Sequence, residues 1–274
     1  MSRTPVALTI AGSDSGGGAG IQADLKAFAR CGVHGTSAIT AITAQNTVEV
    51  RTVQPILPDV ILAQVRAVLA DIAVDAVKVG MLGTTEVTLA VARALDELPA
   101  CTPVVVDPVM VAESGARLLD RDAQRALVQE ILPRATVLTP NLPEARVLAG
   151  EMPRMTDEDD EAEALVRAVL ALGPRVVVLT GGHRARAADL FLDSSGDGSV
   201  VSIEGERHPD GAAHGSGCTH SSVLAAQLAL GSSPLDAARF ARALASEAIE
   251  NGLRDIGEGA GPVDVLDLHH RRLT

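Results

Sequence analysis

The sequence predicts an α/β fold in which a central, mostly parallel β-sheet carries helices on both faces. Two observations support this fold. Strand-like and helix-like segments alternate over most of the 274 residues, and several strand-like segments are continuously apolar. Continuous apolar runs are typical of strands buried on both faces of a parallel sheet. No break in composition divides the chain, so we expect residues 1–274 to form a single domain.

The N-terminal segment has the pattern of the first half of a βα unit. An apolar strand is expected over residues 6–11, and a glycine-rich loop follows from Gly12 to Gly20. Ile21, Leu25 and Phe28 then recur at helical spacing, which predicts a helix over residues 21–30. The loop matches neither the GxxxxGK[ST] phosphate loop nor the dinucleotide fingerprint.

The alternation continues along the rest of the chain. We expect further strands over residues 37–44, 76–80, 103–106, 136–139 and 175–179, and an antiparallel pair over 190–192 and 200–203. We expect helices over residues 59–72 and 85–98, helices that end near 132 and 172, and two C-terminal helices over 222–230 and 234–251.

Polar residues mark several of these helix starts. Asp59 and Asp120 are expected to cap the helices that follow them. Asn141 with Glu144 has the spacing of a capping box, and Thr156 with Asp159 repeats it.

Composition restricts the possible partners and the compartment. The net charge of −12 argues against a surface for nucleic acid or anionic membranes. Three widely spaced cysteines argue against a disulfide framework and favour a reducing compartment, so we expect a cytoplasmic protein. No apolar run reaches the length of a membrane span.

Polar or special residues follow one predicted strand after another. These residues are Asp14, Gln45, Met81, Asp107, Asn141 with Glu144, and Gly181. Ligands of open α/β sheets bind beyond the carboxyl ends of the strands, so these residues are expected to share one cleft. Each residue taken alone is also explained as an ordinary cap or turn residue.

The stretch from His214 to His220 places Gly215, Ser216, Gly217 and Cys218 where a loop enters a helix. Backbone N–H groups at a helix start have no intrahelical partner, and the helix dipole adds partial positive charge. The stretch therefore predicts an anion hole for a phosphate or a developing negative charge. A glycine-rich helix start that binds nothing explains the same residues equally well.

An anion hole beside carboxylates suits phosphoryl transfer. Asp107 and Glu144 would hold Mg²⁺, although the capping box explains Glu144 equally well. Cys218 at the helix start is expected to have a lowered thiol pKa and to accept a proton, unless it only packs beneath the loop. His220 is a lower-ranked candidate for this base.

Six motifs, in order along essentially the whole chain, resemble the hydroxymethylpyrimidine/phosphomethylpyrimidine kinases of thiamine biosynthesis, in the ribokinase-like superfamily. The motifs occupy residues 8–26, 43–47, 78–82, 107–110, 139–145 and 214–219.

The resemblance implies a kinase that uses ATP and Mg²⁺ to phosphorylate 4-amino-5-hydroxymethyl-2-methylpyrimidine and then its monophosphate. It implies that Gln45 binds the pyrimidine, with Gly12, Asp24, Met81 and Val109 beside it. It further implies that Gly215, Ser216, Gly217 and Cys218 form the anion hole, and that Cys218 stands where sugar kinases have a catalytic Asp. Nucleotide and phosphate contacts are implied for Asn141, Thr180 and Gly182, and metal contacts for Glu144 and Asp107. Members of this family are usually homodimers.

Two departures from the family pattern make the site less basic. Thr180 and Glu113 stand where the family often has lysine. A basic contact to the nucleotide phosphate is therefore missing or supplied elsewhere. The alternatives are a pyridoxal kinase on the same scaffold and a non-catalytic pyrimidine-binding protein.

Overall fold

The computed structural model describes residues 3–112, 115, 118–150, 158–183, 186–209 and 211–271. Its strands are β1 (Val6–Asp14), β2 (His34–Gln45), β3 (Val50–Pro55), β4 (Ala76–Val79), β5 (Val104–Val106), β6 (Val137–Leu138), β7 (Val176–Leu179), β8 (Asp189–Asp193) and β9 (Val201–Ile203). Its α-helices are α1 (Gly20–Arg30), α2 (Pro58–Leu69), α3 (Thr85–Asp96), α4 (Arg121–Ala126), α5 (Leu142–Ala149), α6 (Glu158–Leu170), α7 (Ser216–Ala229), α8 (Pro234–Glu250) and α9 (Leu268–Arg271).

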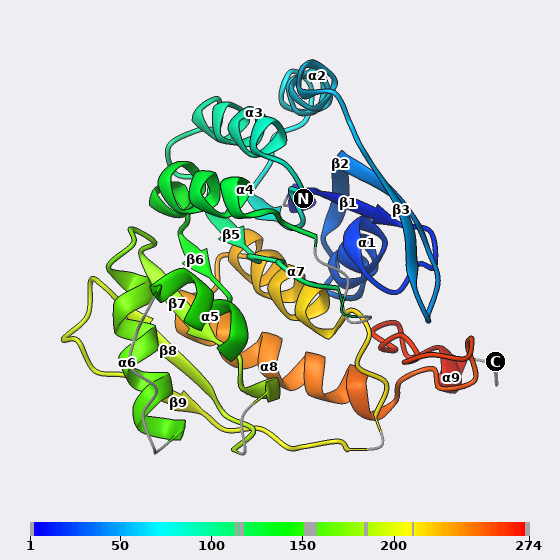
Figure 1. Ribbon diagram of the computed structural model, residues 1–274, viewed down its shortest axis with the longest axis vertical. Helices are drawn as coiled ribbons and strands as arrows, with labels where there is room; N and C mark the ends of the chain where they lie inside the picture. The colour runs from blue at the N-terminus through cyan, green and yellow to red at the C-terminus, as the bar shows by residue number, and fades with distance from the viewer. Residues whose placement is uncertain are drawn as a thin grey trace.

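All of these strands belong to one sheet, in the order β3-β2-β1-β4-β5-β6-β7-β8-β9 (Figure 1). Neighbouring strands from β2 to β7 run parallel, whereas β3, β8 and β9 are antiparallel to their neighbours. The prediction of a mostly parallel sheet, including the antiparallel pair at its end, is confirmed.

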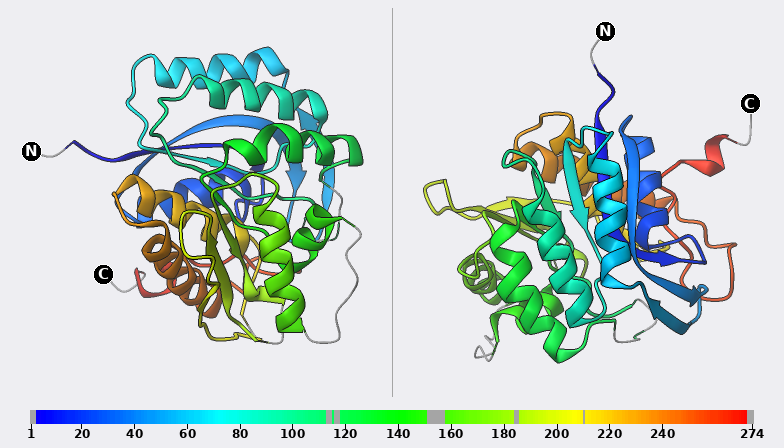
Figure 2. Two further views of the ribbon diagram at one scale, coloured as in Figure 1. Left: turned by 90° about the vertical axis from the view of Figure 1, so that its left-hand side faces the viewer. Right: turned by 90° about the horizontal axis from the view of Figure 1, so that it is seen from above.

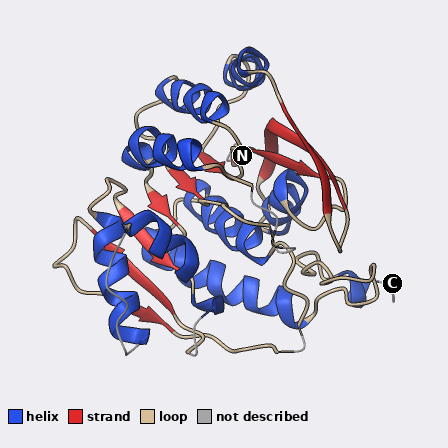
Figure 3. Ribbon diagram, viewed as in Figure 1, coloured by secondary structure: helices blue, strands red, loops and turns tan. Residues whose placement is uncertain are grey.

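Two layers of helices cover the sheet, as the views in Figures 2 and 3 show. Strand side chains alternate between the layers because successive residues of a strand point to opposite faces. In β5, Val104 and Val106 pack in the core beneath α2 to α6, whereas Val105 packs in the core beneath α1, α7 and α8. None of the helices in the described ranges combines the length and apolar character needed to cross a membrane.

Four differences from the sequence predictions concern local structure. Strand β3 was not predicted, and it lacks a burial pattern because nearly all of its residues are exposed. Asp59 is not a cap: α2 begins at Pro58 after Leu57, with no side-chain capping bond. The helix expected to end near 132 instead breaks into α4, a π-helical turn at Leu127–Ile131 and a 3₁₀ turn at Leu132–Arg134 that contains Pro133. α7 also begins at Ser216, six residues earlier than expected.

Two predicted caps are confirmed. The Asp120 side chain accepts a hydrogen bond from the Ala123 N–H at 2.7 Å. Asn141 and Glu144 form a complete capping box at the start of α5, with bonds of 2.9 and 3.0 Å. The expected cap at Thr156 lies outside the described residues.

Candidate active site

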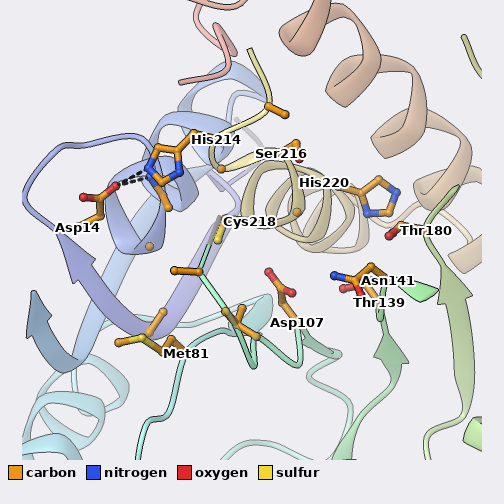
Figure 4. Close-up of a pocket in the computed structure, with 18 of the residues that line it drawn as sticks. Asp14, Met81, Asp107, Thr139, Asn141, Thr180, His214, Ser216, Cys218 and His220 are labelled. Carbon is orange, nitrogen blue, oxygen red and sulfur yellow. Dashed lines mark hydrogen bonds and ion pairs between the residues drawn. The ribbon is translucent and has the colours of Figure 1, made fainter. Parts of the chain in front are cut away.

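A cavity opens at the carboxyl ends of the parallel strands (Figure 4). Its wall includes the residues that follow successive strands, namely Asp14, Gln45, Met81, Asp107, Asn141 with Glu144, and Thr180. The prediction that these residues share one cleft is confirmed. Gly181 is the exception: it is not part of the wall, and its N–H donates to Asp189 at 2.8 Å.

The start of α7 forms one side of this cavity. Gly215 is the N-cap, with a φ of 82° that favours glycine. The first bond within the helix joins the Thr219 N–H to the Gly215 carbonyl, so the N–H groups of Gly217 and Cys218 precede it and have no intrahelical partner. The N–H of Ser216 instead donates to the Ala213 carbonyl at 3.0 Å. An anion at this helix start would therefore meet the free N–H groups of Gly217 and Cys218.

The glycine-rich loop after β1 packs against the start of α7. A Cβ atom on Gly215 would lie 1.8 Å from the Gly18 carbonyl oxygen, so the two loops touch through their backbones. Asp14 accepts hydrogen bonds from three loop N–H groups and from Nε2 of His214, the latter at 3.0 Å. Burial alone would raise the pKa of Asp14, but these bonds outweigh burial and lower it. The ionised carboxylate thus holds both loops together.

Lys78 carries a buried positive charge beneath the cavity. Its side chain is fully buried, with Nζ 3.0 Å from Asp24 Oδ1 and 3.7 Å from Asp107 Oδ2. Burial would lower the pKa of Lys78, but Asp24, Cys218 and Asp107 outweigh burial and raise it above its ordinary value. Sequence reasoning gave this residue no role, although a lysine between Val77 and Val79 in an apolar strand is itself a signal of a buried partner.

Asp24 lies behind the cavity wall. Its carboxylate is fully buried and accepts hydrogen bonds from Thr9 at 2.6 Å and Ser222 at 2.7 Å, besides the one from Lys78. It is not part of the cavity wall, which differs from the position beside the substrate that the resemblance implies. Its position on a buried face of α1 explains the difference: the carboxylate holds Lys78 in place.

The other expected substrate residues do line the cavity. Gln45, Met81, Val109 and Gly12 all form part of its wall. A Cβ atom on Gly12 would lie 2.4 Å from Met81 Cε, so the glycine leaves room for the methionine side chain. The Thr43 hydroxyl lies 2.9 Å from the Ser13 carbonyl oxygen and 3.3 Å from Gln45 Oε1, so it can donate to only one of them at a time.

Cys218 differs electrostatically from the sequence expectation. Burial, together with the carboxylates of Asp107 and Asp24, outweighs Lys78 and raises the pKa of the Cys218 thiol to about 12. The expected lowering of this pKa by the helix start is therefore wrong. The thiol is neutral at physiological pH.

Asp107 and Glu144 form the acidic side of the cavity. Burial, with Asp24 nearby, raises the pKa of Asp107 despite Lys78. Burial and the Asp107 carboxylate raise the pKa of Glu144 to about 8. Within the described residues, no group of three or more His, Cys, Asp or Glu side chains forms a metal site. Two neighbouring oxygen donors suit a Mg²⁺ ion that keeps water and phosphate ligands.

The nucleotide residues implied by the resemblance lie at the opposite end from Gln45. Asn141, Thr180 and Gly182 all line the cavity there. His220, Asp189 and Arg242, which sequence reasoning did not connect, line the same end. These three residues are far apart in the sequence and meet only in the folded chain. No local sequence pattern therefore predicts that they lie together. Glu113 lies outside the described residues.

Comparisons with known proteins agree with this geometry. The family model for phosphomethylpyrimidine kinase matches residues 14–264. The hydroxymethylpyrimidine/phosphomethylpyrimidine kinase of Rhizobium meliloti is 45% identical over 263 residues, which cover 95% of this chain and 96% of the relative.

Two solved structures are similar over most of the chain. The phosphomethylpyrimidine kinase of Clostridium difficile has a TM-score of 0.78 at 38% identity, covering 90% of this chain and 100% of the other. The pyridoxal kinase of Staphylococcus aureus, in complex with AMP-PCP and pyridoxal, has a TM-score of 0.82 at 33% identity, covering 96% and 94%.

Proposed function

The chain belongs to the phosphomethylpyrimidine kinase family, and from this membership we propose that it transfers phosphoryl groups from ATP to hydroxymethylpyrimidine and then to its monophosphate. The observation that carries this proposal is one cavity with a helix start at its centre. Gln45, Asn141 and Thr180 line the same cavity as the start of α7, where the N–H groups of Gly217 and Cys218 are free.

The chain's own residues have distinct tasks in the proposed reaction. Gln45 binds the edge of the aminopyrimidine, and Met81 and Val109 contact its ring. The N–H groups of Gly217 and Cys218 stabilise the transferred phosphoryl group, and Lys78 supplies positive charge from below. Cys218 lies beside the reacting hydroxyl as a neutral thiol. Asp107 and Glu144 would hold Mg²⁺, which neutralises phosphate charge when bound.

We also propose that the protein acts as a cytoplasmic homodimer of single-domain subunits. The three cysteines are free, as a reducing compartment requires. Strand β3 lies at the edge of the sheet and leaves apolar side chains exposed on its hairpin with β2, which suits pairing with a second copy.

A coupled assay for ADP release tests the activity. We expect turnover with the hydroxymethylpyrimidine in the presence of Mg²⁺, with monophosphate and then diphosphate detected by mass spectrometry. EDTA should abolish turnover. Absence of ADP release with the pyrimidine, in protein that binds ATP, would contradict the proposal.

Pyridoxal is the second substrate to test, because the Staphylococcus aureus pyridoxal kinase shares this fold closely. We expect a lower kcat/KM for pyridoxal than for the pyrimidine. A reversed preference would assign the chain to pyridoxal phosphorylation instead.

A further inference from the structure

Three polar side chains from distant segments meet at the end of the cavity that contains Thr180 and Gly182. His220 comes from α7, Asp189 begins β8, and Arg242 comes from α8. They are 4%, 0% and 8% exposed, and all three line the cavity. In Figure 4, the His220 ring and the Thr180 side chain approach this end from α7 and from the end of β7. We call these three residues the His220 cluster.

The bonds within the His220 cluster are incomplete. Nε2 of His220 lies 3.2 Å from Asp189 Oδ2, and Nη1 of Arg242 lies 3.8 Å from Asp189 Oδ1. Arg242 also donates to the Ala187 carbonyl at 2.6 Å. Neither ring nitrogen of His220 makes a hydrogen bond of good geometry. Buried polar atoms in folded proteins nearly always have a hydrogen-bond partner, so an unpartnered imidazole in a cavity wall points to a ligand.

The other basic side chains in the described part of the wall already have partners. Lys78 is paired with Asp24, His214 with Asp14, and Arg242 with a backbone carbonyl. His220 contacts Asp189 through Nε2, so Nδ1 is the ring nitrogen left without a protein partner. Nε of Arg242 also has no partner, so these two nitrogens are the unpartnered buried donors that the His220 cluster presents at this end of the cavity.

The position of His220 on α7 indicates which substrate it faces. Successive residues of an α-helix are rotated by about 100°, so His220 points away from Cys218, two residues earlier, by about 200°. The Cys218 side of the helix faces Lys78 and Asp107. The His220 side faces β7, β8 and α8, where Thr180, Gly182, Ala245 and Ile249 complete the wall.

We propose that His220 is a binding residue for the nucleotide polyphosphate: Asp189 holds Nε2–H, and Nδ1–H donates to a phosphate oxygen. The inference rests on the proposed function, because it takes the nucleotide to bind at this end. In this arrangement one ring N–H points to Asp189 and the other to the phosphate. Asp189 is suited to this task because His220, Arg242 and the Gly181 N–H outweigh burial and lower its pKa. His220 thus supplies the basic contact that Thr180 cannot make.

Two amide substitutions test the contributions of the two ring nitrogens of His220 separately. The amide nitrogen of glutamine in His220→Gln takes the place of Nε2, whereas that of asparagine in His220→Asn takes the place of Nδ1. We would measure Kd for ATP, ADP and adenosine by calorimetry, with Mg²⁺ and without any pyrimidine. His208→Gln is the matched control, because His208 bonds Ser246 and is not part of the cavity wall.

We expect His220→Gln to weaken ATP and ADP binding about tenfold or more, because the variant loses a hydrogen bond to a charged phosphate group. His220→Asn should stay within a few-fold of wild type. Adenosine affinity should not change in either variant, and His208→Gln should match wild type throughout. Melting temperatures would verify that the variants fold.

Three results would overturn the inference. They are unchanged ATP and ADP affinity in folded His220→Gln, an equal loss for adenosine, or an equal loss in His220→Gln and His220→Asn. Failure of the proposed function would look different: the wild type would bind ATP with the expected dependence on His220 but would not phosphorylate the pyrimidine.

Discussion

At the scale of single residues, the neutral thiol of Cys218 limits what this side chain contributes to catalysis. A pKa near 12 leaves almost no thiolate at neutral pH, so the resting site has no thiolate base. We therefore expect Cys218→Ser to lower kcat by less than about tenfold. Loss of a general base would lower it by about 10²–10⁴-fold, so steady-state kinetics distinguish the two roles.

Alkylation measures the protonation of Cys218 directly. In a Cys31→Ser/Cys101→Ser background, iodoacetamide reports on Cys218 alone, because the thiolate is the nucleophile. A raised pKa means that the thiolate fraction keeps growing as pH rises, so the alkylation rate should increase up to at least pH 10. A plateau below pH 9 would show that the thiol is activated after all.

Gln45 is the residue expected to distinguish the two rings. Its carboxamide offers one acceptor and two donors, which match the amino group and adjacent ring nitrogen of an aminopyrimidine. Each buried polar group left unpaired costs roughly 1–3 kcal/mol. We expect Gln45→Leu to lower kcat/KM for the pyrimidine by tens-fold while KM for ATP barely changes. Gln45→Ala should do the same, and an equal loss for pyridoxal would show that Gln45 only shapes the pocket.

At the scale of elements, the Lys78 charge connects α1, β4 and the end of β5. Removing one partner of a buried ion pair leaves an uncompensated charge, which costs about 3–5 kcal/mol. We expect Lys78→Met to lower the free energy of unfolding by that amount in urea, and Asp24→Asn in the same chain to restore part of it. Lys26→Met is the control: among the described residues, this half-buried lysine donates only to the Gly17 carbonyl, so about 1 kcal/mol or less should be lost. A similar loss in both lysine variants would contradict this role.

The start of α5 should make stability depend on pH. Glu144 has a pKa of about 8 in the folded protein, against an ordinary value of 4.5. Between these values the folded state holds more protons than the unfolded state, so the free energy of unfolding falls as pH rises from about 4.5 to 8. Glu144→Gln should reduce this fall, because glutamine keeps the capping bond without titrating. Urea midpoints at pH 5.5 and 8.5 measure the difference, and equal pH slopes in both proteins would refute it.

The sequence predicted elements whose signals are local. Apolar runs located the parallel strands, and the Asn141–Glu144 spacing identified a capping box that the structure contains. It missed β3, whose exposed residues carry no periodic pattern, because pairing with β2 alone defines the strand.

The candidate site, like the fold, was predicted from the sequence only in part. The residues predicted to follow strands do line one cavity, with the exception of Gly181. The burial of Asp24, the raised pKa of Cys218 and the His220 cluster depend on side chains that only the folded chain brings together. Motif spacing carries no information about such neighbours.

At the scale of the whole molecule, the exposed hairpin of β2 and β3 is the surface that we expect to form the dimer interface. Ile42 and Val48 are 51% and 55% exposed. Ile42 pairs with Gln54 and Ala44 with Thr52, so these four residues lie on one face of the hairpin. A second copy of the chain that packed on this face would cover the exposed Ile42 side chain, whereas a lysine in its place would have to be buried without a partner.

We therefore expect light scattering to give twice the 28.2 kDa mass for the wild type, and a single subunit mass for Ile42→Lys. Val147→Lys is the matched control, because Val147 is equally exposed but lies on α5, in the helix layer far from the hairpin along the sheet. This variant should remain a dimer. A monomeric wild type would rule out the homodimer, and a dimeric Ile42→Lys protein would place its interface on another surface.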